Sequence, residues 1–213
     1  MKISLEHISK KFQRHWIFKD INYSFAAPGA YAILGANGSG KSTLLRLIAG
    51  MQSPSNGKVH FEVNGKRTEA NQIFPYIAYC APGMEIVEEL TLREFLEFHF
   101  TFKKPLSSHD TKKETRLSIT DIIALTGLQA SSDKPIADYS SGMKQRVKLA
   151  QAIFSDTPVL LLDEPCSNLD NEGVLQYREW IEKYTRDRLV VVASNDVREY
   201  FFCQEQLHMA QYK

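Results

Sequence analysis

Gly35-Ala-Asn-Gly-Ser-Gly-Lys-Ser42 is the stretch that decides the fold of this chain. Before it, residues 30–34 have the apolar pattern of a short buried strand, and after it residues 43–49 have the pattern of an amphipathic helix that ends at Gly50. Glycines let successive backbone N–H groups point into one nest, and the following helix N-terminus adds partial positive charge. The strand, loop and helix in this order predict a polyphosphate site, the alternative being a glycine-rich turn without a ligand.

The side chains of this loop have expected roles. Lys41 is expected on the β- and γ-phosphates, where it also takes part in catalysis, and Ser42 is expected on a magnesium ion. The residues expected to contact the nucleotide are Gly35, Asn37, Gly38, Ser39, Gly40, Lys41, Ser42 and Thr43.

Two acidic residues follow a second buried stretch, Thr157-Pro-Val-Leu-Leu-Leu-Asp163, which is apolar on both faces, as is typical of a central parallel strand. Asp163 and Glu164 stand at its carboxyl end, where open α/β sheets bind ligands. A triphosphate with Mg²⁺ needs a carboxylate for the metal and, if it is hydrolysed, a group that orients water. We expect Asp163 in the first role and Glu164 in the second. Without the phosphate loop, both would be interpreted as solvated residues at a strand end.

Composition and charge exclude several classes of protein. With 43% hydrophobic and 24% charged residues, the chain has the composition of an ordinary soluble globular protein. A formal charge of +1 gives no electrostatic argument for nucleic acid, and the isolated pairs Lys103-Lys104 and Lys112-Lys113 are interpreted as solvated. No apolar run reaches the roughly 18 residues that span a bilayer, and the N-terminus lacks the apolar region of a signal peptide. We therefore expect a cytoplasmic protein that acts at a membrane only through a partner.

The order of patterns along the chain predicts a mixed α/β core interrupted by helices. Residues 1–34 predict antiparallel β structure, and Asn64-Gly65 after residues 59–63 predicts a hairpin. From about Glu88 to Gln151 the periodicity is helical, with Thr91 and Glu94 as a capping pair. The remaining expected elements are a strand at 76–80, a polar loop at 107–114, helices at 119–126 and 174–184, and a buried strand at 189–193.

Further motifs resemble those of the ATP-binding-cassette (ABC) ATPases. Tyr139-Ser-Ser-Gly-Met143 resembles the family's signature, usually LSGGQ, and residues 159–164 resemble its Walker B strand. Ser167-Asn-Leu-Asp170 resembles its D-loop. Phe12 stands where the family has an aromatic residue that stacks on adenine; Trp16 is a second candidate, and either ring could belong to the core.

The resemblance spans nearly the whole chain and implies one ABC ATP-binding domain, residues 1–213, with a P-loop NTPase (RecA-like) core. Residues 1–87 and 152–213 would form the α/β core with an N-terminal antiparallel β subdomain, and residues 88–151 an inserted helical subdomain that carries the signature. The interval between Lys41 and Ser140 suits one small helical subdomain and is far too short for the coiled coil of chromosome-type ATPase heads.

The resemblance also implies partners. In this family two subunits associate head to tail around two ATP molecules, so Ser140 and the Gly142 amide of one subunit would contact the γ-phosphate held by the other, and Asp170 of the D-loop would also lie at the nucleotide. The dimer could be a homodimer or a heterodimer. The other expected partner is an integral membrane subunit of a transporter, which would place the chain peripherally at the cytoplasmic face of the membrane.

The sequence departs from the family pattern at two functional positions, besides Ser141 and Met143 in the signature. Pro82 stands where a glutamine is usual and offers no side-chain carbonyl to a metal. Asn195 stands where the switch segment usually has a histidine. An asparagine can donate a hydrogen bond to the γ-phosphate as a catalytic contact, but it carries no proton near neutral pH. Both changes leave ATP binding plausible and predict slow hydrolysis.

The leading interpretation is an ATP-hydrolysing subunit that powers an ABC transporter. Pro82 and Asn195 favour the alternative, a regulatory module that binds ATP and hydrolyses little. A DNA-repair or chromosome ATPase is disfavoured by the neutral charge and the short insertion. The aromatic residues of Phe95–Phe102 either dock the membrane subunit's coupling helix or form helix core.

Overall fold

The computed structural model describes residues 1–108 and 115–213. Within them, a five-stranded parallel sheet has the order β11-β3-β10-β9-β6. Its strands are β3 (Gly29–Leu34), β6 (Ile77–Cys80), β9 (Val159–Asp163), β10 (Leu189–Ala193) and β11 (Glu205–His208). Every residue of β9 and β10 is buried, which confirms the prediction of central parallel strands at 157–163 and 189–193.

The described residues also form a four-stranded antiparallel sheet of order β2-β1-β4-β5. Its strands are β1 (Lys2–Phe12), β2 (His15–Ala26), β4 (Asn56–Val63) and β5 (Lys66–Thr68). The predicted hairpin joins β4 to β5, with positive φ of 51° at Asn64 and 74° at Gly65, as a tight hairpin turn requires.

The prediction that all of residues 1–34 are antiparallel is wrong for its last part. After β2 the chain leaves the first sheet, and β3 pairs in parallel with β10 and β11. The residues of β3 from Tyr31 on are buried, and a strand covered on both faces suits the centre of a parallel sheet.

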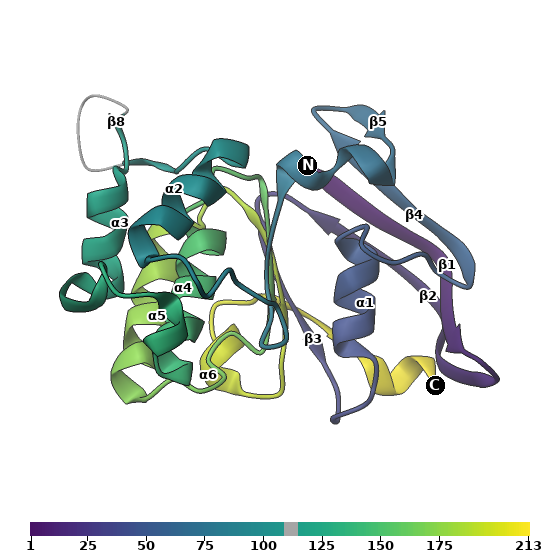
Figure 1. Ribbon diagram of the computed structural model, residues 1–213. Helices are drawn as coiled ribbons and strands as arrows, with labels where there is room; N and C mark the ends of the chain where they lie inside the picture. The colour runs from purple at the N-terminus through teal and green to yellow at the C-terminus, as the bar shows by residue number, and fades with distance from the viewer. Residues whose placement is uncertain (109–114) are drawn as a thin grey trace.

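The helices of the described residues are α1 (Lys41–Ile48), α2 (Leu92–Phe102), α3 (Ile119–Thr126), α4 (Ser141–Ile153), α5 (Asn171–Tyr184) and the short α6 (Val197–Tyr200). Short 3₁₀ turns cover Ala70–Gln72, Phe74–Tyr76, Gln129–Ser131, Ile136–Asp138 and Met209–Tyr212. In Figure 1, α1 lies between the parallel sheet and the antiparallel sheet, whereas α2–α5 lie on the other side of β3. None of the described helices combines the length and the apolarity that crossing a bilayer requires.

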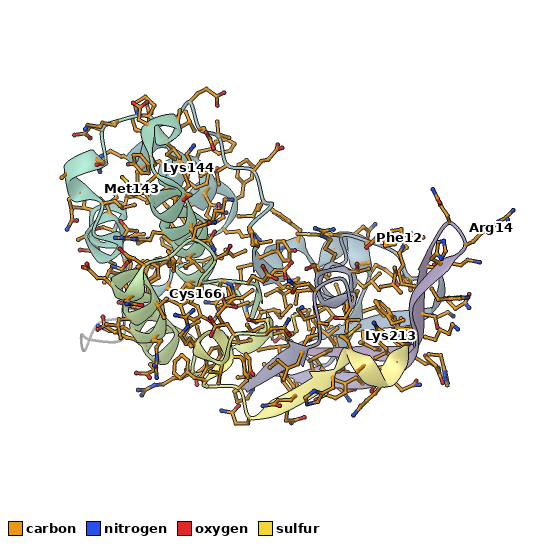
Figure 2. The ribbon with its side chains drawn as sticks, turned by 90° about the horizontal axis from the view of Figure 1, so that it is seen from below. Phe12, Arg14, Met143, Lys144, Cys166 and Lys213 are labelled. Carbon is orange, nitrogen blue, oxygen red and sulfur yellow. The ribbon has the colours of Figure 1, made fainter. Side chains whose placement is uncertain are left out.

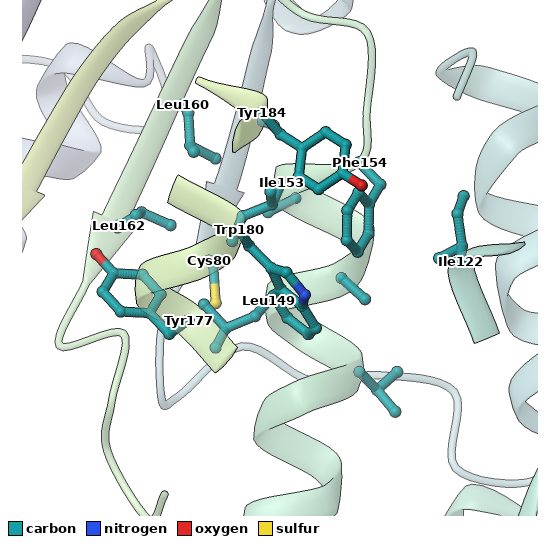
Figure 3. Packing of buried hydrophobic residues seen from close by; sticks show 14 of the residues in the cluster. Cys80, Ile122, Leu149, Ile153, Phe154, Leu160, Leu162, Tyr177, Trp180 and Tyr184 are labelled. Atoms are coloured by element: carbon teal, nitrogen blue, oxygen red, sulfur yellow. The ribbon is translucent and has the colours of Figure 1, made fainter. Parts of the chain in front are cut away.

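Successive residues of the central strands face opposite sides of the parallel sheet and so belong to two separate hydrophobic cores. Leu161 and Val191 pack with α1 and the antiparallel sheet, whereas Leu162 and Val192 pack with α4 and α5. On the second side, the Phe154 ring contacts the rings of Trp180 and Tyr184 at centroid distances of 5.2 and 5.1 Å (Figure 3). These contacts hold α4, which begins within the predicted signature, against α5 and the sheet.

The helical part follows its local signals. The capping box of Thr91 and Glu94 is present, and Gly127 ends α3 with a φ of 68°. The loop predicted at 107–114 begins with β7 (Ser107–Ser108), which pairs with β8 (Thr115–Arg116), and its residues 109–114, with Lys112-Lys113, lie outside the described residues.

Lys103 is not solvated, contrary to the prediction. Its ammonium donates a hydrogen bond to the Ile77 carbonyl and lies 4.3 Å from the centroid of the Phe74 ring. Burial, with the nearby charge of Arg188, lowers the pKa of Lys103 to about 8.

Candidate nucleotide site

The glycine-rich loop connects β3 to α1 and faces a cavity of about 210 Å³. Its lining residues are Ile17, Asn37, Gly38, Gly40, Lys41, Ser42, Thr43 and Glu164. Gly40 has a φ of 101°, and a Cβ atom there would lie 2.5 Å from Ile17 Cγ2, so only glycine lets the loop pack against β2. Gly38 has a φ of 76° and open space where a Cβ would lie, which leaves the loop accessible to a ligand.

Lys41 is a buried cation held by neutral groups. Its side chain is buried, and its Nζ donates to the carbonyls of Gly35 at 2.6 Å and Ala36 at 3.4 Å. In the described part of the chain, no carboxylate forms an ion pair with it. An ammonium at the edge of a cavity with only carbonyl partners is suited to an anionic ligand such as a phosphate.

Ser42 and Asp163 meet beside this ammonium. The Ser42 hydroxyl donates to Asp163 Oδ1 at 3.0 Å, and Asp163 is only 4% exposed. Burial raises the pKa of Asp163 above its ordinary value, and the hydrogen bond from Ser42 offsets part of that effect.

The oxygen donors of this pair fit Mg²⁺, which prefers a few protein oxygens completed by phosphate and water. No cluster of three His, Cys, Asp or Glu side chains suited to a metal occurs among residues 1–108 and 115–213.

Glu164 follows Asp163 in a strained backbone conformation. Its φ is 43°, which is uncommon for a residue with a Cβ, and its backbone N–H donates to the Ala193 carbonyl at 2.9 Å. This turn leaves the Glu164 side chain exposed at the lining of the cavity, whereas Asp163 stays buried. Two adjacent carboxylates thus have different environments.

Asn195 reaches the glycine-rich loop from the end of β10. Its Oδ1 accepts from the Gly35 N–H at 3.2 Å, and its Nδ2 donates to Asn37 Oδ1 at 3.4 Å. The fold thus brings together the loop residues, Asp163, Glu164 and Asn195 at the carboxyl ends of β3, β9 and β10.

The predicted signature and D-loop residues lie elsewhere. The Ser140 hydroxyl caps α4 by accepting from the Met143 N–H at 3.2 Å, and a Cβ at Gly142 would lie 3.0 Å from the Asn168 carbonyl oxygen. Asp170 caps α5 by accepting from the Gly173 N–H at 2.8 Å. Figure 2 shows Met143 far across the molecule from the hairpin of β1 and β2, and α4 and α1 are likewise apart in Figure 1.

Phe12 and Trp16 lie on that hairpin, outside the cavity lining. Phe12 is 46% exposed, with the Lys10 ammonium 5.1 Å from its ring centroid, and Lys11 lies 5.3 Å from that of Trp16. Neither ring belongs to the core, so a stacking role for either stays a prediction.

Pro82, which the resemblance places at the family's glutamine position, follows β6. Its carbonyl accepts from Lys148 Nζ of α4 at 2.7 Å. The segment expected to carry a glutamine side chain thus has a backbone carbonyl that is hydrogen-bonded to α4.

Two residues near the site carried no sequence signal. Ile17, which contacts the loop at Gly40, reads only as one apolar residue in a strand. Glu199 is a glutamate in a polar stretch, yet it is buried and bonded to Cys166 and Ser194. The burial of Glu199 becomes evident only from the way α6 packs in the folded chain.

Comparisons with known proteins agree with this geometry. Residues 18–167 match the family described as "ABC transporter". The chain is 31% identical over 183 residues to the sulfate/thiosulfate import ATP-binding protein CysA of Halalkalibacterium halodurans, covering 86% of this chain and 51% of that protein. It is 28% identical to the ABC transporter ATP-binding protein YybJ of Bacillus subtilis, covering 91% of this chain and 85% of that one. The chain thus spans about half the length of CysA.

Solved structures share the fold. An ATP-binding cassette solved as a dimer in a post-hydrolysis state with ADP and Pi superposes with a TM-score of 0.80 at 22% identity, covering 97% of this chain and 93% of that one. An ABC transporter ATP-binding protein from Pyrococcus furiosus gives a TM-score of 0.79 at 17% identity over the full length of both chains. The P-loop NTPase type of α/β fold is thereby confirmed, and with the match over residues 18–167 the chain belongs to the ABC transporter family.

Proposed function

We propose that this chain is the ATP-binding and ATP-hydrolysing subunit of an ABC transporter and that it powers a separate membrane subunit. The observation that carries the proposal is the 3.0 Å contact of Ser42 with Asp163 beside the buried ammonium of Lys41. Those groups match a triphosphate and its metal in charge and in donor type. The import and transporter names of CysA and YybJ support the transport part of the proposal.

In this proposal the loop amides and Lys41 bind the β- and γ-phosphates, and Ser42 and Asp163 hold the metal. A bound Mg²⁺ supplies charge neutralisation on the phosphate oxygens. The exposed carboxylate of Glu164 orients the attacking water, because it lines the same cavity as the loop. The Asn195 amide exchanges its contact with Asn37 for a hydrogen bond to the γ-phosphate.

The proposed active unit is a dimer, either homomeric or heteromeric. In one subunit the predicted signature residues Ser140 and Gly142 lie at the start of α4, and α4 lies apart from α1, the helix that follows the phosphate loop (Figure 1). A second subunit placed head to tail would bring that signature to the nucleotide. Because ATP would then contact both subunits, its binding would favour association, and hydrolysis would release it.

The second proposed partner is a helix of the membrane subunit, bound in a groove of about 420 Å³ between the end of α1 and α2. The aromatic residues of α2 divide between core and groove: Phe95 is buried, whereas Phe98 and Phe102 are 53% and 63% exposed and line the groove. Lys103 also lines it and has no carboxylate partner among the described residues. The groove therefore suits a helix with apolar side chains and one carboxylate, and it would place the chain at the cytoplasmic face of the membrane.

Phosphate release by the purified protein tests the ATPase, with Glu164→Gln as the blank. Magnesium-dependent turnover that falls at least about 100-fold in Glu164→Gln is the expected result. Equal release from both proteins would instead favour the second candidate, an ATP-dependent regulatory module, which Pro82 and Asn195 support.

A further inference from the structure

We propose that Glu199 is a positioning residue of the ATPase site, because its one carboxylate ties together the loop that carries Glu164 and the loop that carries Asn195. This inference rests on the proposed function and adds a residue that none of the phosphate-binding or signature motifs contains.

The carboxylate of Glu199 is buried, at 4% exposure, and each of its oxygens has a different partner. Oε1 accepts from the Cys166 backbone N–H at 2.7 Å, and Oε2 accepts from the Ser194 hydroxyl. The Glu199 main-chain carbonyl accepts from the Tyr177 hydroxyl at 2.7 Å, a second contact of this residue that links α6 to α5 and does not involve the carboxylate. The two side-chain contacts can therefore be tested separately from the packing of α6.

Those contacts join segments that follow neighbouring strands. Cys166 lies just after Glu164 at the end of β9, and Ser194 directly precedes Asn195 at the end of β10. The backbone joins the same segments at their start, where the Glu164 N–H donates to the Ala193 carbonyl. Glu199 extends this connection into the loops themselves.

Both partners of Glu199 are donors, which explains the choice of a carboxylate. An ionised carboxylate only accepts, so it satisfies a backbone N–H and a hydroxyl at once. The Ser194 oxygen meanwhile accepts from the Asp196 N–H at 2.9 Å, so its proton is free to point at Glu199. Burial raises the pKa of Glu199, and the bonds from Ser194 and Cys166 counter that effect.

The contacts of the Glu199 carboxylate matter because the backbone of the loop that carries Glu164 is strained. Glu164 has a φ of 43° and Asn168 a φ of 65°, both positive. Such conformations are unfavourable for residues with a Cβ atom and persist only where the surroundings enforce them. Without the bond to Cys166, the segment after Glu164 is free to relax, and the carboxylate then loses its alignment with the γ-phosphate.

The test compares Glu199→Ala, Glu199→Gln and the matched control Tyr177→Phe. Because the phosphate loop is untouched, all three should bind Mg·ATP within about threefold of the wild type. Glu199→Ala should lower kcat by about 10- to 100-fold. Glu199→Gln should restore most of it, since its amide oxygen can accept from Cys166 while its NH₂ donates to Ser194. Tyr177→Phe removes a buried hydrogen bond of the same helix, so it should lower Tm without that loss of kcat.

Amide hydrogen exchange gives a readout that does not need turnover. Glu199→Ala should exchange faster than Glu199→Gln at residues 164–168 and 194–196, and Tyr177→Phe should not share this pattern. If wild-type protein released no phosphate, the proposed function would fail, and exchange alone would decide this inference. Equal kcat in Glu199→Ala and wild type, an equal kcat loss in Tyr177→Phe, or unchanged exchange at both segments would overturn it.

Discussion

The Ser42 hydroxyl donates a 3.0 Å hydrogen bond to Asp163, a residue 121 positions away in the sequence. The contact exists because β3 and β9 run in the same direction on either side of β10, so their carboxyl ends meet at one edge of the sheet. The cavity at that edge is lined by Lys41, Ser42 and Glu164. The carboxylate of Asp163 lies beside it and accepts the hydrogen bond from Ser42. The proposed function depends on this arrangement.

Replacement of Glu164 should trap the dimer. Glu164→Gln keeps the shape of the side chain and removes the group that we expect to orient water, so ATP should bind without being hydrolysed and hold two subunits together. Gel filtration with ATP and Mg²⁺ should show a dimer for the variant and a monomer when nucleotide is omitted. A monomer under both conditions would contradict the head-to-tail arrangement.

The pH dependence of turnover should reflect the amide at position 195. Asn195 carries no titrating proton, so kcat of the wild type should show no imidazole inflection between about pH 6 and 7.5. Asn195→His should raise kcat and introduce an inflection near the ordinary imidazole pKa of about 6.5. A wild-type profile with that inflection already present would reject the role assigned to Asn195.

His99 should make the protein sensitive to acid. Its Nε2 lies 2.8 Å from Ser155 Oγ, and burial, with the neighbouring charge of Lys103, lowers the pKa of His99 from 6.5 to about 4. As the pH falls below 6.5, His99 becomes protonated in the unfolded chain but stays neutral in the folded chain. The free energy of unfolding therefore decreases until the pH reaches about 4, where His99 is protonated in the folded chain as well.

Between about pH 7 and 5 this group should cost the folded state about 2 kcal/mol. His99→Gln places an amide donor near the same hydroxyl without the titration, so urea unfolding of the variant should lose less stability over this range. An identical loss in both proteins would show that His99 is not the responsible group.

The groove beside α2 should be needed for the membrane partner and not for ATP. Phe102→Glu introduces a charge on the groove wall, and Leu175→Glu is a matched control, because Leu175 is a similarly exposed apolar residue of α5 outside the groove. We expect Phe102→Glu alone to abolish co-sedimentation with membranes of the source cell while both variants keep the ATP affinity of the wild type. Equal co-sedimentation of the two variants with membranes would show that the groove does not bind the membrane partner.

The sequence predicts those parts of the fold that depend on a few neighbouring residues. The glycine-rich loop, the fully apolar β9 and β10, the Asn64-Gly65 turn and the Thr91 cap each follow from a few adjacent residues. The loop and the Asp163-Glu164 pair together predict the position of the site, because open α/β sheets bind ligands at strand ends.

The features that the sequence does not predict depend on contacts between distant residues. The transfer of β3 to the parallel sheet is set by its pairing with β10 and β11, and the burial of Lys103 by Phe74 and the Ile77 carbonyl. The role of Glu199 depends on Cys166, which lies 33 positions earlier. No local periodicity carries such information, because each of these contacts exists only after the chain has folded.

Calorimetry of Mg·ATP binding tests the central claim most directly, with wild-type protein, Lys41→Ala and, as a control, Lys66→Ala on the exposed strand β5. The claim predicts heat of binding for the wild type and for Lys66→Ala, and a loss of about 2–5 kcal/mol of binding free energy in Lys41→Ala, because the variant removes the buried cation from the loop. No heat with wild-type protein, or the same affinity in Lys41→Ala, would contradict it.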